Sequence, residues 1–282
     1  MKDPSLQSPA YNIYKDYNVS VIVPFYNEKW ILRNLNILED ELGRFFKNYE
    51  IILVSDGSTE LDIKKLIETQ KNAPHIKVLH YKTNNGKGYA LKHGYYHSKG
   101  DFIVFIDGGM ELHPRDIKRF LVLIDIYKAD IVIGSKRHPY SRVHYPLHRR
   151  ILSFCYQIFI RIFLNLKQVK DTQVGLKLFR RQVLEDVLPR ILVKKYAFDL
   201  EVLTVANHLG YVEILEAPVE LNYFRNKTNK GILKDIIHTL KVTWPLLVDT
   251  LAIIYRLRVK KHYGHSSKKH VRAVSAVTDT LL

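Results

Sequence analysis

Two carboxylates in this chain stand at the ends of predicted buried strands, where open α/β sheets bind ligands. Asp107 follows the apolar run 102–106, and Asp56 follows the run 50–54. The carboxyl ends of parallel strands meet at one edge of a sheet, so we expect the two side chains to lie close together. A carboxylate there can ligate a hard divalent cation, and such a cation neutralises a diphosphate. Taken alone, either aspartate is equally well explained as a solvated turn residue.

Two further polar segments follow predicted strands. Residues 24–28 come after a strand at 19–23, and residues 84–88 (Asn-Asn-Gly-Lys-Gly) come after a strand at 76–81. The second segment opens a predicted helix, so its free backbone N–H groups and Lys87 can hold phosphate oxygens. Its glycine spacing is not that of a Walker A loop, and no Gly-x-Gly-x-x-Gly sequence follows the first strand, which disfavours a dinucleotide-binding fold.

The elements that must position these residues alternate along the chain. From residue 19 to about 133, short apolar runs alternate with stretches of helical period, which predicts an α/β fold with a mostly parallel sheet flanked by helices. Helices are expected at 29–47, 61–72, 87–98 and 114–128, the last led by Pro114, and a further strand at 130–134. Another helical stretch begins near Phe198, and Asp199 is expected to cap it.

The charge of the chain indicates what kind of molecule it binds. The chain has 282 residues, and its 44 lysines and arginines against 28 acidic residues give a net charge of +16, which predicts an acidic partner. The basic residues gather beside apolar segments and form no recognisable nucleic-acid motif, so we expect phosphorylated ligands and a membrane surface, and no nucleic acid. The single cysteine, Cys155, excludes an internal disulfide. The N-terminal segment lacks the apolar core of a secretory signal, so we expect a cytoplasmic protein.

Two apolar segments with basic flanks predict helices that lie in a membrane interface. Residues 151–166 are apolar, but at about 16 residues they fall short of the ~20 needed to span a bilayer. Residues 232–257 are interrupted by charges and by Pro245, and a basic cluster follows them. We therefore expect peripheral contact with an anionic membrane surface, without transmembrane helices.

The order of these segments resembles that of family 2 GT-A glycosyltransferases. The resemblance is carried by residues 19–28, 54–58, 85–90 and 106–107, and within the family residues 134–137, 146–150, 171–179 and 198–201 resemble the dolichol-phosphate mannose and glucose synthases. It implies a GT-A glycosyltransferase domain at 18–225. A polar segment at 1–17 would precede this domain, and a membrane-interface helical segment at 226–263 and a mobile tail at 264–282 would follow it.

The resemblance also implies roles for individual residues. The nucleoside of the donor would be surrounded by Pro24, Tyr26, Glu28 and Asp56, with Asp56 reading the base and Lys87 near the donor. Asp107 would be the first carboxylate of an Asp-x-Asp motif that binds Mg²⁺ or Mn²⁺. Because Gly109 stands where the second aspartate belongs, metal binding should be weakened unless Glu111, two residues further on, or water completes the metal site.

The acceptor side is expected to be basic. Catalysis would involve Asp107, Asp171, Gln173 and Arg137. The acceptor phosphate would be held by Arg137, Arg149, Arg150 and Lys177, because cationic side chains, and guanidinium groups above all, match phosphate oxygens.

The resulting hypothesis is a glycosyltransferase that moves a hexose from a nucleotide sugar, UDP-glucose or GDP-mannose, to a polyprenyl or dolichyl phosphate at the cytosolic membrane face. One alternative is a family 2 enzyme with another glycan or lipid acceptor. A second alternative, motivated by Gly109, is a non-catalytic nucleotide-sugar-binding protein.

Overall fold

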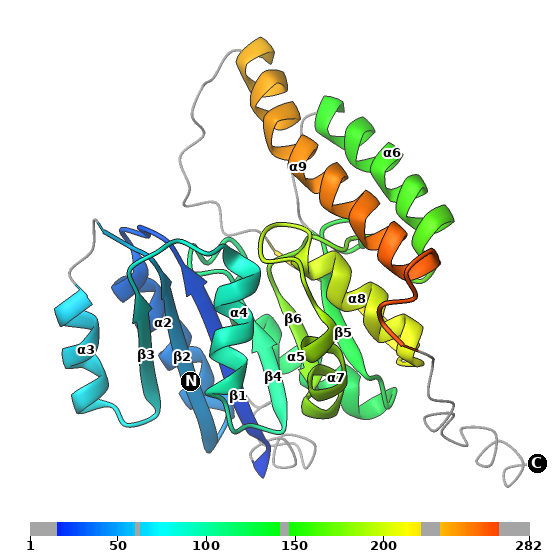
Figure 1. Ribbon diagram of the computed structural model, residues 1–282. Coiled ribbons are helices and arrows are strands. Elements are labelled where there is room, and N and C mark those ends of the chain that lie inside the picture. Colours follow the sequence, from blue (N-terminus) through cyan, green and yellow to red (C-terminus); the bar gives the residue numbers. More distant parts are fainter. Residues whose placement is uncertain (1–15, 60–62, 142–146, 221–231, 265–282) are drawn as a thin grey trace, which may run out of the picture.

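The computed structural model describes residues 16–59, 63–141, 147–220 and 232–264, with the backbone alone at 147–155 and 232–242. Its core is a seven-stranded sheet in the order β3-β2-β1-β4-β6-β5-β7 (Figure 1). The strands are β1 (Asn18–Phe25), β2 (Asn48–Asp56), β3 (Ile76–Tyr81), β4 (Phe102–Phe105), β5 (Ile131–Ser135), β6 (Lys177–Arg180) and β7 (Ile214–Pro218). Strand β6 is antiparallel to its neighbours β4 and β5, and the other described pairs are parallel. The predicted mostly parallel α/β sheet is therefore confirmed.

The central strands are covered on both faces. From Val19 to Phe25 every residue of β1 is buried, including the polar Ser20, which is the continuous pattern expected of a strand between two helical layers. In the register of the sheet, Val21 lies between Ile51 of β2 and Val104 of β4. All three side chains are fully buried, so this register places the apolar runs of three strands in one core.

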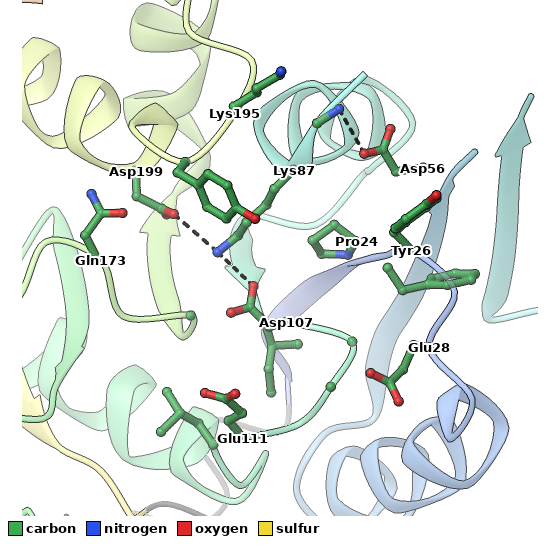
Figure 2. Close-up of a pocket in the computed structure, with 18 of the residues that line it drawn as sticks. Pro24, Tyr26, Glu28, Asp56, Lys87, Asp107, Glu111, Gln173, Lys195 and Asp199 are labelled. Carbon is green, nitrogen blue, oxygen red and sulfur yellow. Dashed lines mark hydrogen bonds and ion pairs between the residues drawn. The ribbon is translucent and has the colours of Figure 1, made fainter. Parts of the chain in front are cut away.

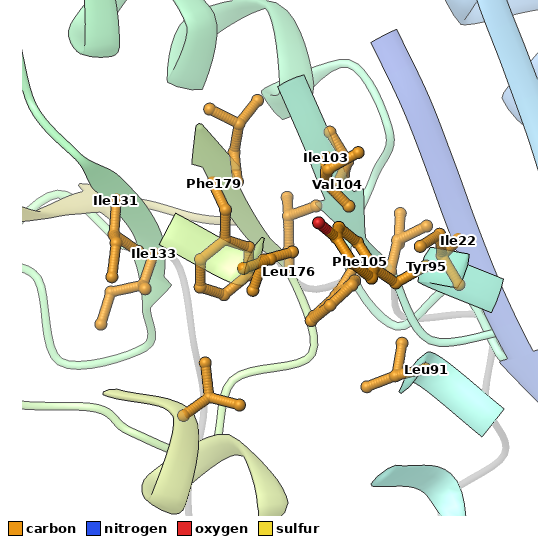
Figure 3. Packing of buried hydrophobic residues seen from close by; sticks show 14 of the residues in the cluster. Ile22, Leu91, Tyr95, Ile103, Val104, Phe105, Ile131, Ile133, Leu176 and Phe179 are labelled. Atoms are coloured by element: carbon orange, nitrogen blue, oxygen red, sulfur yellow. The ribbon is translucent and has the colours of Figure 1, made fainter. Parts of the chain in front are cut away.

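Helices form a layer on each face of this sheet (Figure 1). One layer contains α2 (Ile31–Phe45) and α5 (Asp116–Ile126), and the other contains α4 (Lys87–Tyr96), α7 (Arg181–Val187) and α8 (Phe198–Leu209), while α3 (Ile63–Asn72) packs beside β3 and the short η3 (Leu188–Arg190) follows α7. In the core, Phe105 of β4 and Phe179 of β6 lie with ring centroids 5.0 Å apart (Figure 3). The helices predicted between residues 29 and 128 are present, but each is a few residues shorter than predicted. Pro114 precedes α5, and its carbonyl accepts the Ile117 N–H.

Two long helices, α6 (Leu147–Leu164) and α9 (Ile232–Arg258), lie side by side beyond α8 (Figure 1). The Arg258 guanidinium donates to the carbonyls of Phe163 and Ile162 at the end of α6, and the Tyr156 and Thr250 hydroxyls are 2.8 Å apart. These bonds hold the second halves of the two helices together. Within the described residues, none of the helices has both the length and the apolar character needed to cross a membrane. The predicted tail after Gly264 and most of the N-terminal segment lie outside the described residues.

Candidate active site

A cavity of about 660 Å³ opens at the edge of the sheet where the parallel strands end. Because β6 runs in the opposite direction, the segment that precedes it reaches the same edge. The cavity is lined by Pro24, Phe25, Tyr26, Glu28, Asp56, Asn84, Gly86, Lys87, Ile106, Asp107, Gly108, Gly109, Glu111, Leu112, Lys136, Gln173, Gly175, Lys195, Tyr196 and Asp199. Figure 2 shows Tyr26 and Asp56 on one side and Gln173 on the other, with Lys87 and Asp107 between them.

Asp56 organises the first side of the cavity. Its carboxylate is 4% exposed and accepts three hydrogen bonds, from the Tyr81 hydroxyl at 2.9 Å, the Asn85 N–H at 2.8 Å and the Gly86 N–H at 2.9 Å. Burial and the bond to Asp56 raise the pKa of Tyr81, so the phenol stays a donor. A carboxylate has about four acceptor positions, so one remains for an N–H of a bound ligand.

The same bonds fix the turn that carries Lys87. Gly86 has a φ of 98°, and a Cβ there would lie 2.5 Å from the carbonyl oxygen of Lys194. Glycine is thus required both by the backbone conformation and by the close approach of the 194–196 loop. The Gly88 N–H donates to that same Lys194 carbonyl, at 2.8 Å. The turn and the loop before α8 are therefore joined, and this places Lys195 at the cavity.

Lys87 stands between two carboxylates. Its ammonium lies 2.7 Å from Asp107 Oδ1 and 3.2 Å from Asp199 Oδ2 (Figure 2). Behind them, Asp199 Oδ1 lies 2.8 Å from the ammonium of Lys177. Burial alone would lower the pKa of Lys87, but the two carboxylates raise it above its usual range. Burial would likewise raise the pKa of Asp199, but Lys177 and Lys87 hold it below its usual range. Lys87 and Asp199 are therefore charged at neutral pH, whereas burial lowers the pKa of Lys177.

The two residues predicted to bind a divalent cation suit an ion that takes only a few of its ligands from the protein. Asp107 and Glu111 line the same cavity, and the described part of the chain contains no cluster of three or more acidic, histidine or cysteine side chains that could enclose a metal. Mg²⁺ is commonly held by one or two carboxylates together with substrate phosphates and water. Asp107 and Glu111 would be the protein ligands of such an ion.

Gly175 leaves room for Asp107. A Cβ on Gly175 would lie 2.1 Å from Asp107 Oδ2, so no larger residue fits beside this carboxylate as it stands. Two residues earlier, the Gln173 side-chain nitrogen is buried and has no hydrogen-bond partner among the described residues, which leaves a donor for a ligand. Asp171 plays a different part, because its carboxylate accepts the Lys136 N–H at 2.9 Å and so positions Lys136, which lines the cavity.

The structure brings together eight of the residues predicted for the site, namely Pro24, Tyr26, Glu28, Asp56, Lys87, Asp107, Glu111 and Gln173. Arg137, Asp171 and Lys177 are not among the residues that line the cavity, and Lys177 is 1% exposed behind Asp199. Arg149 and Arg150 lie in α6, and their side chains are outside the described part of the chain. The predicted roles of these five residues stay predictions.

Among the polar residues at the cavity, the sequence prediction gave no role in the site to Lys136, Lys195, Tyr196 and Asp199. Asp199 was expected to cap α8, and this is wrong: the N-cap is Ala197, no side chain caps the helix, and Asp199 pairs with two lysines instead. The signal for this pairing was that Asp199 and Lys177 both stand in apolar runs, because a charged side chain that is buried needs a partner of opposite charge.

Comparisons of this chain with protein families, with individual proteins and with solved structures all find glycosyltransferases. The family model for glycosyl transferase family 2 matches residues 20–188. A dolichyl-phosphate beta-glucosyltransferase of Dictyostelium discoideum is 34% identical over 228 residues, covering 76% of this chain and 68% of that protein. Another from Saccharomyces cerevisiae is 26% identical and covers 71% and 66%. Among solved structures, glucosyl-3-phosphoglycerate synthase from Mycobacterium tuberculosis, in complex with Mn²⁺, UDP-glucose and phosphoglyceric acid, has a TM-score of 0.61 at 18% identity and covers 87% and 82%, which shows a shared fold.

Proposed function

This chain belongs to glycosyl transferase family 2, and from that premise we propose that it transfers glucose from UDP-glucose to dolichyl phosphate at a membrane surface. The observation that carries the proposal is one continuous cavity with Asp56 on one side, Gln173 on the other, and the Lys87–Asp107 pair between them. The names of the relatives support glucose as the sugar and dolichyl phosphate as the acceptor. Family membership favours an enzyme over the non-catalytic binding protein that Gly109 had left open.

The first side of the cavity suits the nucleotide. Tyr26 is 54% exposed and offers a flat apolar surface for a base, and Asp56 has one acceptor position for the imide N–H of uracil. Lys87 supplies positive charge for the diphosphate. A divalent cation held by Asp107 and Glu111 would neutralise the charge that develops on the leaving diphosphate.

The second side suits a phosphate monoester. An acceptor phosphate already carries negative oxygens, so the attack on the sugar needs no strong general base. One phosphate oxygen forms the new bond to the anomeric carbon while the bond to the diphosphate breaks, and UDP leaves with the electron pair. Gln173 has a side-chain donor without a partner among the described residues, and Lys136 adds positive charge nearby. We assign Arg137, Arg149 and Arg150 to the acceptor phosphate as predicted from the sequence.

Access to a membrane acceptor is supported by an apolar stripe on α9. Its members recur every three or four residues, so they share one face of the helix. They are Trp244, Val248, Leu251 and Tyr255, with 69%, 49%, 57% and 50% of their surface exposed, and Val259, directly after the helix, is 65% exposed. On the neighbouring helix α6, Ile158 and Ile162 are also exposed.

Basic residues follow this stripe directly. Arg258 is the last residue of α9, and Lys260 and Lys261 follow it. Each basic residue near an anionic surface contributes about 1 kcal/mol to membrane attachment. We therefore propose that the α6–α9 pair rests on the cytosolic face of the membrane, where the headgroup of dolichyl phosphate can reach the cavity.

The donor is tested by parallel transfer assays. UDP-glucose and GDP-mannose, each with a labelled sugar, are incubated with the full chain and dolichyl phosphate in detergent, with Mn²⁺ or with EDTA. The proposal expects metal-dependent label in the lipid from UDP-glucose and none above background from GDP-mannose. Label from GDP-mannose alone would overturn the assignment of the sugar.

A further inference from the structure

Four alternating charges run from the cavity into the protein core. Asp107 is 45% exposed at its side chain and faces the cavity, Lys87 is 25% exposed, Asp199 is 5% exposed and Lys177 is 1% exposed. The charges come from four separate elements: the loop after β4, the first residue of α4, the first turn of α8 and the first residue of β6. Their order fixes which group meets a ligand first and which lies behind it.

Lys87 therefore has two anchors of different character. Asp107 is exposed and is also the predicted ligand of the divalent cation. Asp199 is buried, and its second oxygen is held by Lys177, whose ammonium also donates to the Val174 carbonyl. When Asp107 turns to a cation, Asp199 is the carboxylate among the described residues that still pairs with the Lys87 ammonium and keeps it beside the cavity.

We propose that Asp199 is a positioning residue for donor binding, which holds Lys87 beside the donor diphosphate while Asp107 ligates a divalent cation. This inference rests on the proposed function, because it takes the diphosphate of a nucleotide sugar as the ligand. Gly109 gives it a specific consequence: the motif has a single aspartate to hold the cation, so the fixed ammonium of Lys87 supplies part of the positive charge that the diphosphate needs.

The test measures UDP affinity by calorimetry, with Mn²⁺ and with EDTA. The variant combines Asp199→Asn with Lys177→Met, so that no buried lysine is left without a partner; neutralising both members of a buried pair is far better tolerated than removing one. The control is Lys177→Met alone, which leaves Asp199 paired with Lys87. Thermal unfolding checks that each variant folds.

In the double variant, UDP affinity with Mn²⁺ should fall about tenfold, the cost of one charge-assisted bond. With EDTA it should change less than about twofold, because Asp107 then still anchors Lys87. The control should keep the wild-type ratio of the two affinities. Adding Lys87→Met to the double variant should produce no larger loss than Lys87→Met alone, because both changes withdraw the same ammonium from the diphosphate.

A merely structural role for Asp199 predicts equal losses with Mn²⁺ and with EDTA, and that result would overturn the proposal. An unchanged affinity in Mn²⁺ would overturn it as well. If the wild-type chain binds no UDP under either condition, the proposed function itself fails and this inference falls with it. Wild-type binding combined with an unaffected double variant would refute the positioning role alone.

Discussion

Replacing Gly175 with alanine should disable the site without unfolding the protein. The new Cβ would lie 2.1 Å from Asp107 Oδ2 and 2.7 Å from Asp107 Cγ, whereas real Cβ contacts do not fall below 3.0 Å. The carboxylate must therefore move by about 1 Å or rotate away, which disturbs its 2.7 Å contact with Lys87. A displacement of about 1 Å at a reacting centre can cost about 100-fold in rate, so we expect kcat/KM for glucose transfer to fall by about that factor.

Folding should be affected far less. Asp107 is nearly half exposed, so its side chain can adopt another rotamer at the cost of about 1 kcal/mol, and Gly175 has no positive φ that alanine would strain. The assay pairs glucose transfer with thermal unfolding, and Gly43→Ala serves as the control, because its Cβ would meet Tyr49 at 3.4 Å, an ordinary contact. Wild-type activity in Gly175→Ala, or activity lost only in proportion to unfolded protein, would refute the reasoning.

Three other predictions concern the metal, the pH and the membrane. Glu111→Gln should weaken Mn²⁺ binding in the presence of UDP about tenfold by electron paramagnetic resonance, and adding Gly109→Asp should restore it; an unchanged affinity would exclude Glu111 as a ligand. Burial, and the imidazole of His97 just after α4, lower the pKa of His93 below its usual value of 6.5. The stability that His93 contributes is therefore present above that pH and is lost as the pH falls. Urea unfolding at pH 7 and pH 5 should therefore show a smaller loss in His93→Phe than in wild type, and equal losses would contradict this. Leu251→Glu should reduce sedimentation with anionic vesicles, while Ile126→Glu, on the similarly exposed side chain of α5, should not; equal effects would argue against the stripe on α9.

The parallel half of the sheet and its edge were predictable because their signals are local. Each strand there is a short apolar run followed directly by polar residues, so Asp56, Lys87 and Asp107 could be assigned to one edge from the topology of parallel strands alone. The structure confirms this arrangement, since all three line one cavity.

The inner half of the site was not predictable in the same way. Strand β6 has four residues, too few to show a period, and it is antiparallel, so the rule for strand ends gave no position for Lys177. Asp199 lies 112 residues after Lys87 in sequence, and their pairing depends on how α8 packs against α4. The remaining signal was physical: a lysine between Leu176 and Leu178 cannot be buried without a partner carboxylate.

The loop before α8 carried still less signal. Lys195 and Tyr196 are exposed residues in an irregular segment, and nothing in their spacing distinguishes them from other surface residues. They reach the cavity because the Lys194 carbonyl accepts the N–H groups of Gly88 and Tyr89, a contact between segments about 105 residues apart. Such contacts follow from tertiary packing and not from local pattern.

The central claim is that glucose is transferred to the phosphate oxygen of a polyprenyl lipid. Its most direct test incubates the full chain with UDP-glucose labelled in the sugar and, in separate detergent reactions, with dolichyl phosphate or with dolichol. The account predicts label in the lipid with dolichyl phosphate and none above background with dolichol, because the proposed reaction needs an acceptor that already carries negative oxygens. Equal label in the two lipids, or label in neither while UDP binds, would contradict it.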